Sequence, residues 1–297
     1  MPEFPDPTVS AYRFGSAVAR GLPGGLAGLA TRAVGAGAAG TMRERRALVE
    51  RNLRRVYGPD FGGVRMRRAV QQTFDSYARY WVESFRLPDM SDAQLDDGMA
   101  FEGYQHIDAA LRRGIGPILA LPHLGGWDWA AFWMARVQRQ PVAAVVEPLE
   151  PPELFKWFVE FRESLGMTVI PLGKGAGTAV MEAIRRADVI TLVSDRDIEG
   201  NGVEVEFFGE TTTLPAGPAT LALRTGAPLL PAAIYFRGRG HHAVIRAPIP
   251  VERRGRLRAD VTRITQLMAR ELEVLIRAEP EQWHLMQPNW PSDRDLA

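Results

Sequence analysis

One short run of the sequence carries residue types that can do acid–base chemistry. In GPILALPHLGGWDWA, His123 is followed after four intervening residues by Asp128. A carboxylate that holds one imidazole nitrogen fixes the tautomer and stabilises the imidazolium, so that the other nitrogen can remove a proton from a hydroxyl. Such a general base contributes about 10²–10⁴-fold in rate. The spacing predicts that Asp128 folds back to orient His123; a purely structural pair is the competing interpretation.

The flanking residues place His123 at the end of a strand. Apolar Pro117–Leu121 predicts a strand, and Trp127 begins a helix. Between them, Gly125 and Gly126 let the backbone pass close to a substrate. Reactive groups of open α/β sheets lie just beyond the carboxyl ends of the strands. This position favours the catalytic interpretation of His123.

From about residue 101 the chain alternates short apolar runs with helical stretches. The expected strands are Pro117–Leu121, Val142–Val146, Thr168–Pro171, Val189–Val193, Val203–Phe208, Leu229–Phe236 and Ala243–Ala247. The helices expected between most of them span 104–113, 127–137, 152–165, 177–187, 216–225 and 257–277. This alternation predicts an α/β fold, with a mixed, mostly parallel sheet flanked by helices on both faces.

The residues before this core predict an N-terminal helical subregion. Residues 8–40 are small and apolar with a break at Pro23–Gly25, and further helices are expected at Thr41–Tyr57 and Val64–Arg86. Positions 1–90 hold 14 Arg and no Lys against 8 acidic residues, so they carry +6, whereas the whole chain carries +1. A basic region favours contact with an anionic surface such as lipid headgroups; packing of these helices on the protein's own core is the alternative.

The sequence shows neither a linker nor an internal repeat. We therefore expect one domain over residues 1–297, with a helical, membrane-apposed part at 1–100 and a catalytic α/β core at 101–297. The charge-free runs near the N-terminus are only 11 and 10 residues long, whereas a spanning helix needs ~20. The acidic, proline-rich opening MPEFPDP is unlike a secretory signal. These features favour a cytoplasmic protein that can touch a membrane.

Several kinds of chemistry are excluded or disfavoured. The chain has no Cys, which excludes thiolate metal sites and a Cys nucleophile, and it has no Gly-x-Ser-x-Gly elbow. His241 and His242 stand without a ligand pattern, so no metal is expected. The loop Gly173–Gly177 lacks the Walker spacing for a phosphate. The Arg-rich stretches lack base-stacking motifs, so no nucleic-acid partner is expected.

At a strand end, His-x4-Asp resembles the first motif of the glycerolipid acyltransferase superfamily, whose members move a fatty acyl group from a thioester to a hydroxyl. The runs GVEVEFFGE (Gly202–Glu210) and TLPAGPATLALRTGAPLLP (Thr213–Pro231) are similar to the bacterial branch that includes the late lipid A acyltransferases. The block PEQWHLMQPNWP (Pro280–Pro291) resembles the actinobacterial phosphatidylinositol mannoside acyltransferases. The resemblance covers about residues 45–290.

The resemblance implies roles for individual residues. His123 matches the catalytic base, and Asp128 matches its orienting carboxylate. The substrate-binding positions that it implies are Glu147, Arg162, Asp195 and Arg196. Ordinary ion pairs at strand ends are the alternative interpretation of these four. The aromatic residues that could line an acyl trench, with core packing as the alternative, are Phe155, Trp157, Phe158, Phe161, Phe207 and Phe208.

The implied reaction is transfer of a long-chain fatty acyl group from acyl-CoA to a mannose hydroxyl of a phosphatidylinositol mannoside. The hydroxyl would attack directly, without an acyl-enzyme, and acyl-CoA would be a co-substrate with no further cofactor. The implied setting is an anionic membrane surface at the cytoplasmic face, where the protein would be peripheral. The alternatives are another glycolipid or lysolipid acceptor, an acyl carrier protein donor, or a non-catalytic acyl-CoA or lipid-binding protein.

Overall fold

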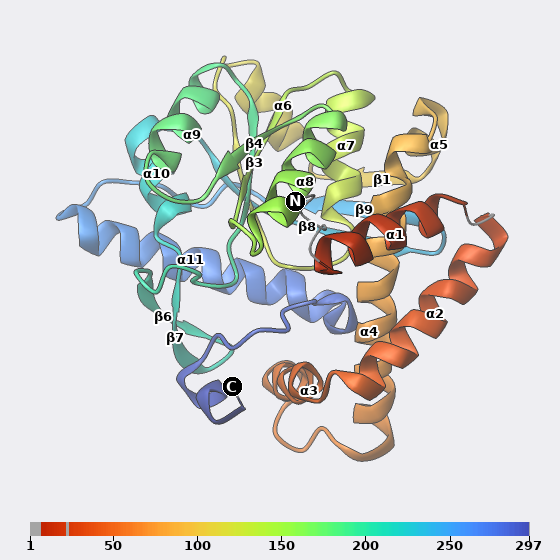
Figure 1. Ribbon diagram of the computed structural model, residues 1–297. Helices are drawn as coiled ribbons and strands as arrows, with labels where there is room; N and C mark the ends of the chain where they lie inside the picture. The colour runs from red at the N-terminus through yellow and green to blue at the C-terminus, as the bar shows by residue number, and fades with distance from the viewer. Residues whose placement is uncertain (1–6, 22–23, 297) are drawn as a thin grey trace, which may run out of the picture.

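A seven-stranded sheet forms the centre of the computed structural model, which describes residues 7–21 and 24–296 (Figure 1). The strands of this sheet are β1 (Met99–Glu102), β2 (Ile118–Leu121), β3 (Val142–Val146), β4 (Met167–Pro171), β5 (Val189–Val193), β8 (Leu229–Arg237) and β9 (Gly240–Ile245). Two further strands, β6 (Val203–Phe207) and β7 (Glu210–Leu214), pair only with each other in an antiparallel hairpin.

Helices alternate with most of the strands and also form the N-terminal part. The α-helices are α1 (Pro7–Gly21), α2 (Gly24–Thr41), α3 (Arg43–Tyr57), α4 (Gly63–Arg86), α5 (Asp92–Asp97), α6 (Gln105–Leu111), α7 (Trp127–Arg136), α8 (Pro152–Ser164), α9 (Ala176–Arg185), α10 (Gly217–Thr225) and α11 (Leu257–Ala278). The described residues also form the short 3-10 helices η1 (Leu87–Asp89), η2 (Pro280–Gln282) and η3 (Pro291–Leu296). Among the described residues, no helix combines the length and hydropathy that a membrane crossing requires.

The strand order confirms the predicted fold class. The order is β1-β9-β8-β2-β5-β3-β4, in which β8, β2, β5, β3 and β4 run parallel. Strand β9 is antiparallel to β8, and β1 pairs with β9 in parallel. The sheet is therefore mixed and mostly parallel, and its helices lie on both faces as expected.

The side chains of β2 point alternately to the two faces of the sheet, and this explains the two layers of helices. Ile118 and Ala120 belong to a core shared with buried residues of α9, α10 and α11. Leu119 and Leu121 belong to a second core shared with α7, whose Trp133 is 2% exposed. Because successive strand residues point to opposite faces, an almost wholly apolar strand must be covered on both sides.

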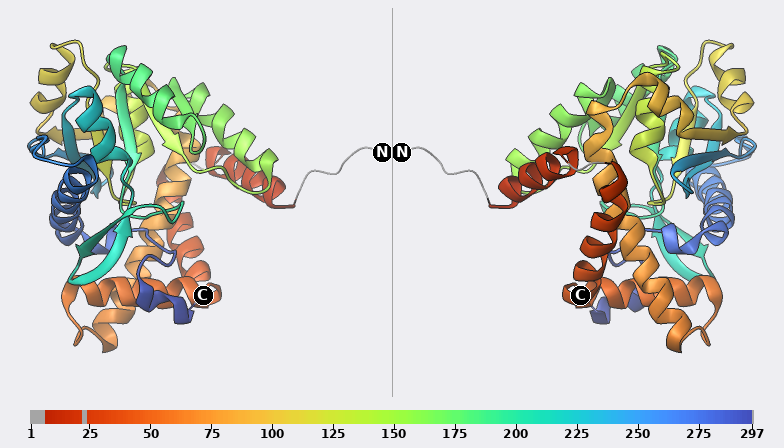
Figure 2. Two further views of the ribbon diagram at one scale, coloured as in Figure 1. Left: turned by 90° about the vertical axis from the view of Figure 1, so that its left-hand side faces the viewer. Right: turned by 90° about the vertical axis from the view of Figure 1, so that its right-hand side faces the viewer.

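The N-terminal helices are built around α4, which runs steeply along the right-hand side of the molecule in Figure 1. Helix α2 packs along α4, and α1 lies between α4 and α8 (Figure 2). One face of α4 is buried, including Phe74, Tyr80 and Phe85. Trp81 of the same helix contacts Tyr12 of α1 and Phe158 of α8. The predicted helical subregion is thus joined to the α/β core through aromatic packing.

Candidate active site

Strand pairing brings His123 and Asp195 together. In the β2–β5 pair, Leu121 lies opposite Val193, so the residues two positions further along each strand emerge side by side. His123 Nδ1 lies 2.6 Å from Asp195 Oδ1, and the His123 backbone N–H donates to Asp195 Oδ2 at 3.0 Å. Both residues stand just beyond carboxyl strand ends, where α/β enzymes place their chemistry. After His123 the backbone turns through Gly125 at φ 62°, where a Cβ would overlap the Ile234 carbonyl oxygen.

Asp195 is fully buried and held as an anion. Burial alone would raise its pKa, but the facing His123 imidazole and the hydrogen bonds from His123 and Trp283 outweigh burial, so the Asp195 pKa lies below its usual value. An ionised carboxylate only accepts hydrogen bonds, which assigns the imidazole proton to Nδ1 of His123. Nε2 then has a free lone pair. This is the tautomer that a general base needs.

Asp128 does not orient His123, contrary to the sequence expectation. Its carboxylate accepts a hydrogen bond from the Tyr80 hydroxyl at 2.7 Å and pairs with Arg162, whose Nε lies 3.2 Å from Oδ1. Asp128 belongs to the first turn of α7, and its side chain reaches α4 and α8. Burial would lower the Arg162 pKa, but Asp128 more than offsets it and the Arg162 pKa is raised. The side chain that orients His123 is Asp195.

The other predicted polar residues gather at the same edge of the sheet. Glu147 follows β3 and Arg196 follows the end of β5, and Arg196 Nη2 donates to Glu147 Oε2 at 2.6 Å. Because β3 is the neighbour of β5, this ion pair lies beside the His123–Asp195 pair. Within residues 7–21 and 24–296, no group of three or more His, Asp or Glu side chains is arranged to hold a metal ion.

A cavity of about 660 Å³ opens beside these residues. Five of the six residues singled out from the sequence line it, and Asp195 lies behind His123. The apolar part of its wall includes Leu121, Ala131, Ala144, Met167, Val180 and Leu221. Phe158 also lines it, as expected, whereas Phe207 and Phe208 instead pack against Trp283. A polar edge on an apolar cavity suits a substrate with one reactive end and a long hydrocarbon part.

Trp283 and His284 support the His123–Asp195 pair, and the sequence analysis did not identify them. The indole Nε1–H of Trp283 donates to Asp195 Oδ2 at 2.8 Å, and the backbone N–H of His284 donates to the His123 carbonyl oxygen at 2.6 Å. Burial, with the nearby His123, lowers the pKa of His284 to about 3. Both residues belong to the block PEQWHLMQPNWP. Its aromatic and polar residues were the only feature of the sequence that could have indicated a role at the site.

This fold and site together define an α/β protein with a His–Asp pair at the carboxyl edge of its sheet, beside a cavity with a largely apolar wall. Comparison with known proteins gives the particular family. The family model of the bacterial lipid A biosynthesis acyltransferases matches residues 7–292. The chain therefore belongs to the bacterial lipid A biosynthesis acyltransferase family and is an acyltransferase, which confirms the resemblance drawn from the sequence.

Three individual relatives match most of this chain and share one name. Proteins named phosphatidylinositol mannoside acyltransferase from Mycobacterium tuberculosis strains CDC 1551 / Oshkosh and ATCC 25618 / H37Rv are each 41% identical over 227 residues, covering 74% of this chain and 70% of theirs. A protein of the same name from Mycolicibacterium smegmatis is 39% identical over 248 residues, covering 82% of this chain and 79% of its own.

Proposed function

We propose that this acyltransferase moves a long-chain fatty acyl group from acyl-CoA to a mannose hydroxyl of a phosphatidylinositol mannoside. The name shared by the three relatives supports this acceptor. The hydrogen bond from His123 Nδ1 to the buried Asp195 is the single observation that carries the mechanism. It leaves Nε2 of His123 as the proton acceptor beside the cavity.

The proposed reaction is a direct transfer. Nε2 of His123 removes the proton from the acceptor hydroxyl as its oxygen attacks the thioester carbonyl carbon, and Asp195 stabilises the imidazolium. The carbonyl oxygen becomes an oxyanion, and the first turn of α7, whose N–H groups have no acceptor within the helix, favours negative charge there. The tetrahedral intermediate then collapses, the C–S bond breaks, and the imidazolium returns its proton to the CoA thiolate.

Two features argue for direct attack over an acyl-enzyme. The chain has no Cys. Ser194, which adjoins Asp195, is fully buried and its hydroxyl donates to the Leu192 carbonyl oxygen at 2.8 Å. Ser194 lies at the cavity wall, but its hydroxyl proton is held by the Leu192 carbonyl oxygen and not by His123, so the acceptor oxygen is the better nucleophile.

The cavity is the proposed site of the acyl chain. Burying hydrocarbon contributes about 0.8 kcal/mol per methylene, so a long tail gains several kcal/mol from the apolar wall after ordering costs. This gain holds the thioester carbonyl at the polar edge, where His123 and the acceptor hydroxyl meet. No other cofactor is needed for this step.

The proposal places the enzyme at the cytoplasmic face of an anionic membrane as a peripheral protein. Phe14 of α1 is 72% exposed and Val34 of α2 is 57% exposed, and the exposed Arg13, Arg32 and Arg43 lie on or beside the same helices. Exposed apolar side chains accompanied by arginines suit the headgroup region, where each Arg near the surface contributes about 1 kcal/mol.

The test is acyl transfer by the purified protein from palmitoyl-CoA to phosphatidylinositol mannosides in mixed micelles. CoA release is measured with a thiol reagent, to which this Cys-free chain adds no background, and the product is identified by mass spectrometry. His123→Ala and Asp195→Asn should each lower kcat about 10²–10⁴-fold, because the first removes the base and the second favours the wrong tautomer.

The matched control is His106→Ala on α6, which should keep the wild-type rate. Near-native transfer by His123→Ala would exclude that residue as the base. A panel with other glycolipids, lysolipids and an acyl carrier protein donor identifies the true substrates if phosphatidylinositol mannosides fail. Binding of palmitoyl-CoA without any release of CoA would overturn the enzymatic reaction altogether.

A further inference from the structure

The carboxylate of Asp195 receives three hydrogen bonds, which divide its two oxygens between different tasks. Oδ2 accepts from the His123 backbone N–H at 3.0 Å and from Trp283 Nε1 at 2.8 Å. Oδ1 faces Nδ1 of His123. With Oδ2 held by two donors, the carboxylate cannot rotate about its last bond without losing both. Oδ1 is thereby kept pointing at the imidazole.

Trp283 is suited to this task by its chemistry and its surroundings. The indole N–H is a donor only, so it stabilises the ionised carboxylate and cannot accept from a protonated one. Its ring is 4% exposed and packs against Phe207 and Phe208, with centroids 6.3 and 5.5 Å away. A flat, rigid ring enclosed in this way presents its N–H in one direction.

The chain segment that carries Trp283 also holds the backbone around His123. The carbonyl oxygen of His123 accepts from the His284 backbone N–H at 2.6 Å, and the Gly125 N–H donates to the Gln282 carbonyl oxygen at 3.0 Å. Leu124 and Trp283 form an isolated antiparallel bridge. One segment therefore supports both members of the pair.

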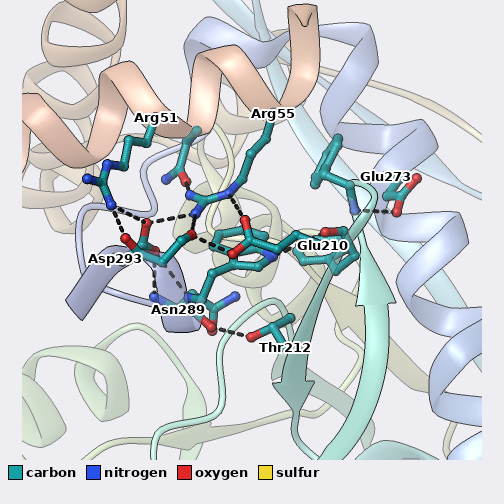
Figure 3. Close-up of polar contacts among 12 residues, drawn as sticks. Arg51, Arg55, Glu210, Thr212, Glu273, Asn289 and Asp293 are labelled. Carbon is teal, nitrogen blue, oxygen red and sulfur yellow. Dashed lines mark hydrogen bonds and ion pairs between the residues drawn. The ribbon is translucent and has the colours of Figure 1, made fainter. Parts of the chain in front are cut away.

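A second group of contacts anchors this segment further along the chain (Figure 3). The amide Nδ2 of Asn289 donates to the Asp195 carbonyl oxygen at 3.0 Å. Asp293, 1% exposed, accepts from the backbone N–H groups of Asn289 and Trp290 at 3.0 and 3.1 Å through Oδ2. Its other oxygen pairs with Arg55 of α3 at 2.8 Å. Arg55 also lies 3.9 Å over the Trp290 ring, so α3 fixes the far end of the segment.

We propose that Trp283 is a positioning residue of the reaction: its indole N–H holds Asp195 in the orientation that makes His123 a general base, and the Asn289–Asp293 anchor keeps the segment in place. This inference rests on the proposed function of His123. Trp283 does not line the cavity, so its action passes through Asp195 and not through substrate contact.

The charges of Asp195 and His123 predict the direction in which loss of the Trp283 N–H changes the pH dependence of the reaction. The indole N–H neutralises part of the Asp195 negative charge, and this reduces the attraction between Asp195 and the imidazolium form of His123. Removal of the donor strengthens that attraction. The acidic limb of the kcat/KM profile against pH should therefore move to higher pH.

The test compares Trp283→Phe with Trp290→Phe. Both tryptophans are buried in the same segment and both donate a hydrogen bond, but Trp290 Nε1 donates to the Phe207 carbonyl oxygen at 3.1 Å instead of to Asp195. Trp283→Phe should lower kcat about ten-fold or more, as expected for a lost hydrogen bond to a charged acceptor, and move the acidic limb up by about half a pH unit. Its KM for palmitoyl-CoA should change less than three-fold. Trp290→Phe should keep the wild-type acidic limb.

The same shift of the acidic limb in both variants, or no shift in Trp283→Phe, would overturn the proposal. If Trp283→Phe does not fold, benzothienyl-alanine at position 283 keeps the ring shape without the N–H and tests the same bond. The NMR signal of the His123 Nδ1 proton in wild type and variant separates this inference from the proposed function. An Nδ1 proton signal that moves in Trp283→Phe, in a protein that transfers no acyl group, would support the positioning contact and refute the reaction.

Discussion

The buried His284 imidazole makes the stability of this protein sensitive to mild acid. Burial lowers its pKa from 6.5 to about 3, and the neighbouring His123 acts in the same direction. Between these two values the unfolded chain binds a proton that the folded protein excludes. The free energy of unfolding therefore falls as the pH falls through this window, by about 1.4 kcal/mol per pH unit.

The pKa of His284 sets how much stability is lost between pH 7.5 and pH 4.5. Between pH 7.5 and pH 4.5, His284 alone should remove about 3 kcal/mol from the free energy of unfolding. Asp195 adds little in this range: its pKa in the folded protein lies below that of an ordinary Asp side chain, so the stability that its carboxylate contributes is lost only at lower pH.

The assay is urea unfolding of wild type and His284→Gln, followed by intrinsic fluorescence at half-unit steps between these pH values. A glutamine can still reach the hydroxyl of Ser76, which lies 2.8 Å from Nε2 of His284, but it takes up no proton. The variant should lose about 3 kcal/mol less than wild type across the range. His106→Gln, at a half-buried position on α6, is the matched control and should lose as much as wild type. Equal acid sensitivity in wild type and His284→Gln would refute the reasoning.

Two further variants test the site and the cavity. Asp128→Asn should lower the free energy of unfolding by about 3 kcal/mol, measured by urea titration, because Arg162 stays buried without its counter-charge; an unchanged midpoint would show that the Asp128–Arg162 pair is dispensable. Ala144→Phe, which fills part of the cavity wall, should shift acyl-CoA preference toward shorter chains in competition assays, at about 0.8 kcal/mol per methylene excluded. An unchanged preference would place the acyl chain elsewhere.

Local sequence patterns predicted most of the fold. Strands β3 and β5 have the bounds expected from their β-branched, apolar residues, Val142–Val146 and Val189–Val193. The expectation missed β1, which has four residues and is largely exposed, and β7, whose threonines pair with β6 outside the main sheet. Neither strand buries a continuous apolar run, so hydrophobic periodicity gave no signal for them.

The candidate site was only partly predictable for a different reason. His123 could be found because its strand, turn and glycines are contiguous in the chain. Its partner Asp195 is 72 positions away, and only the order of strands in the sheet makes them neighbours. Nearness in sequence favoured Asp128, but the side chain of Asp128 leaves the first turn of α7 toward Tyr80 and Arg162.

The neighbouring positions of β2 and β5 have a consequence for how the enzyme is inactivated. A slip of β5 by a single residue would turn its alternating side chains over and carry Asp195 away from His123. The ladder between β2 and β5, in which every residue of β2 is buried, therefore protects the catalytic geometry, while helices that contact neither the pair nor its supporting segment can open locally without disturbing it. Heat or denaturant should abolish the chemical step only when the whole core melts, even if substrate access fails earlier.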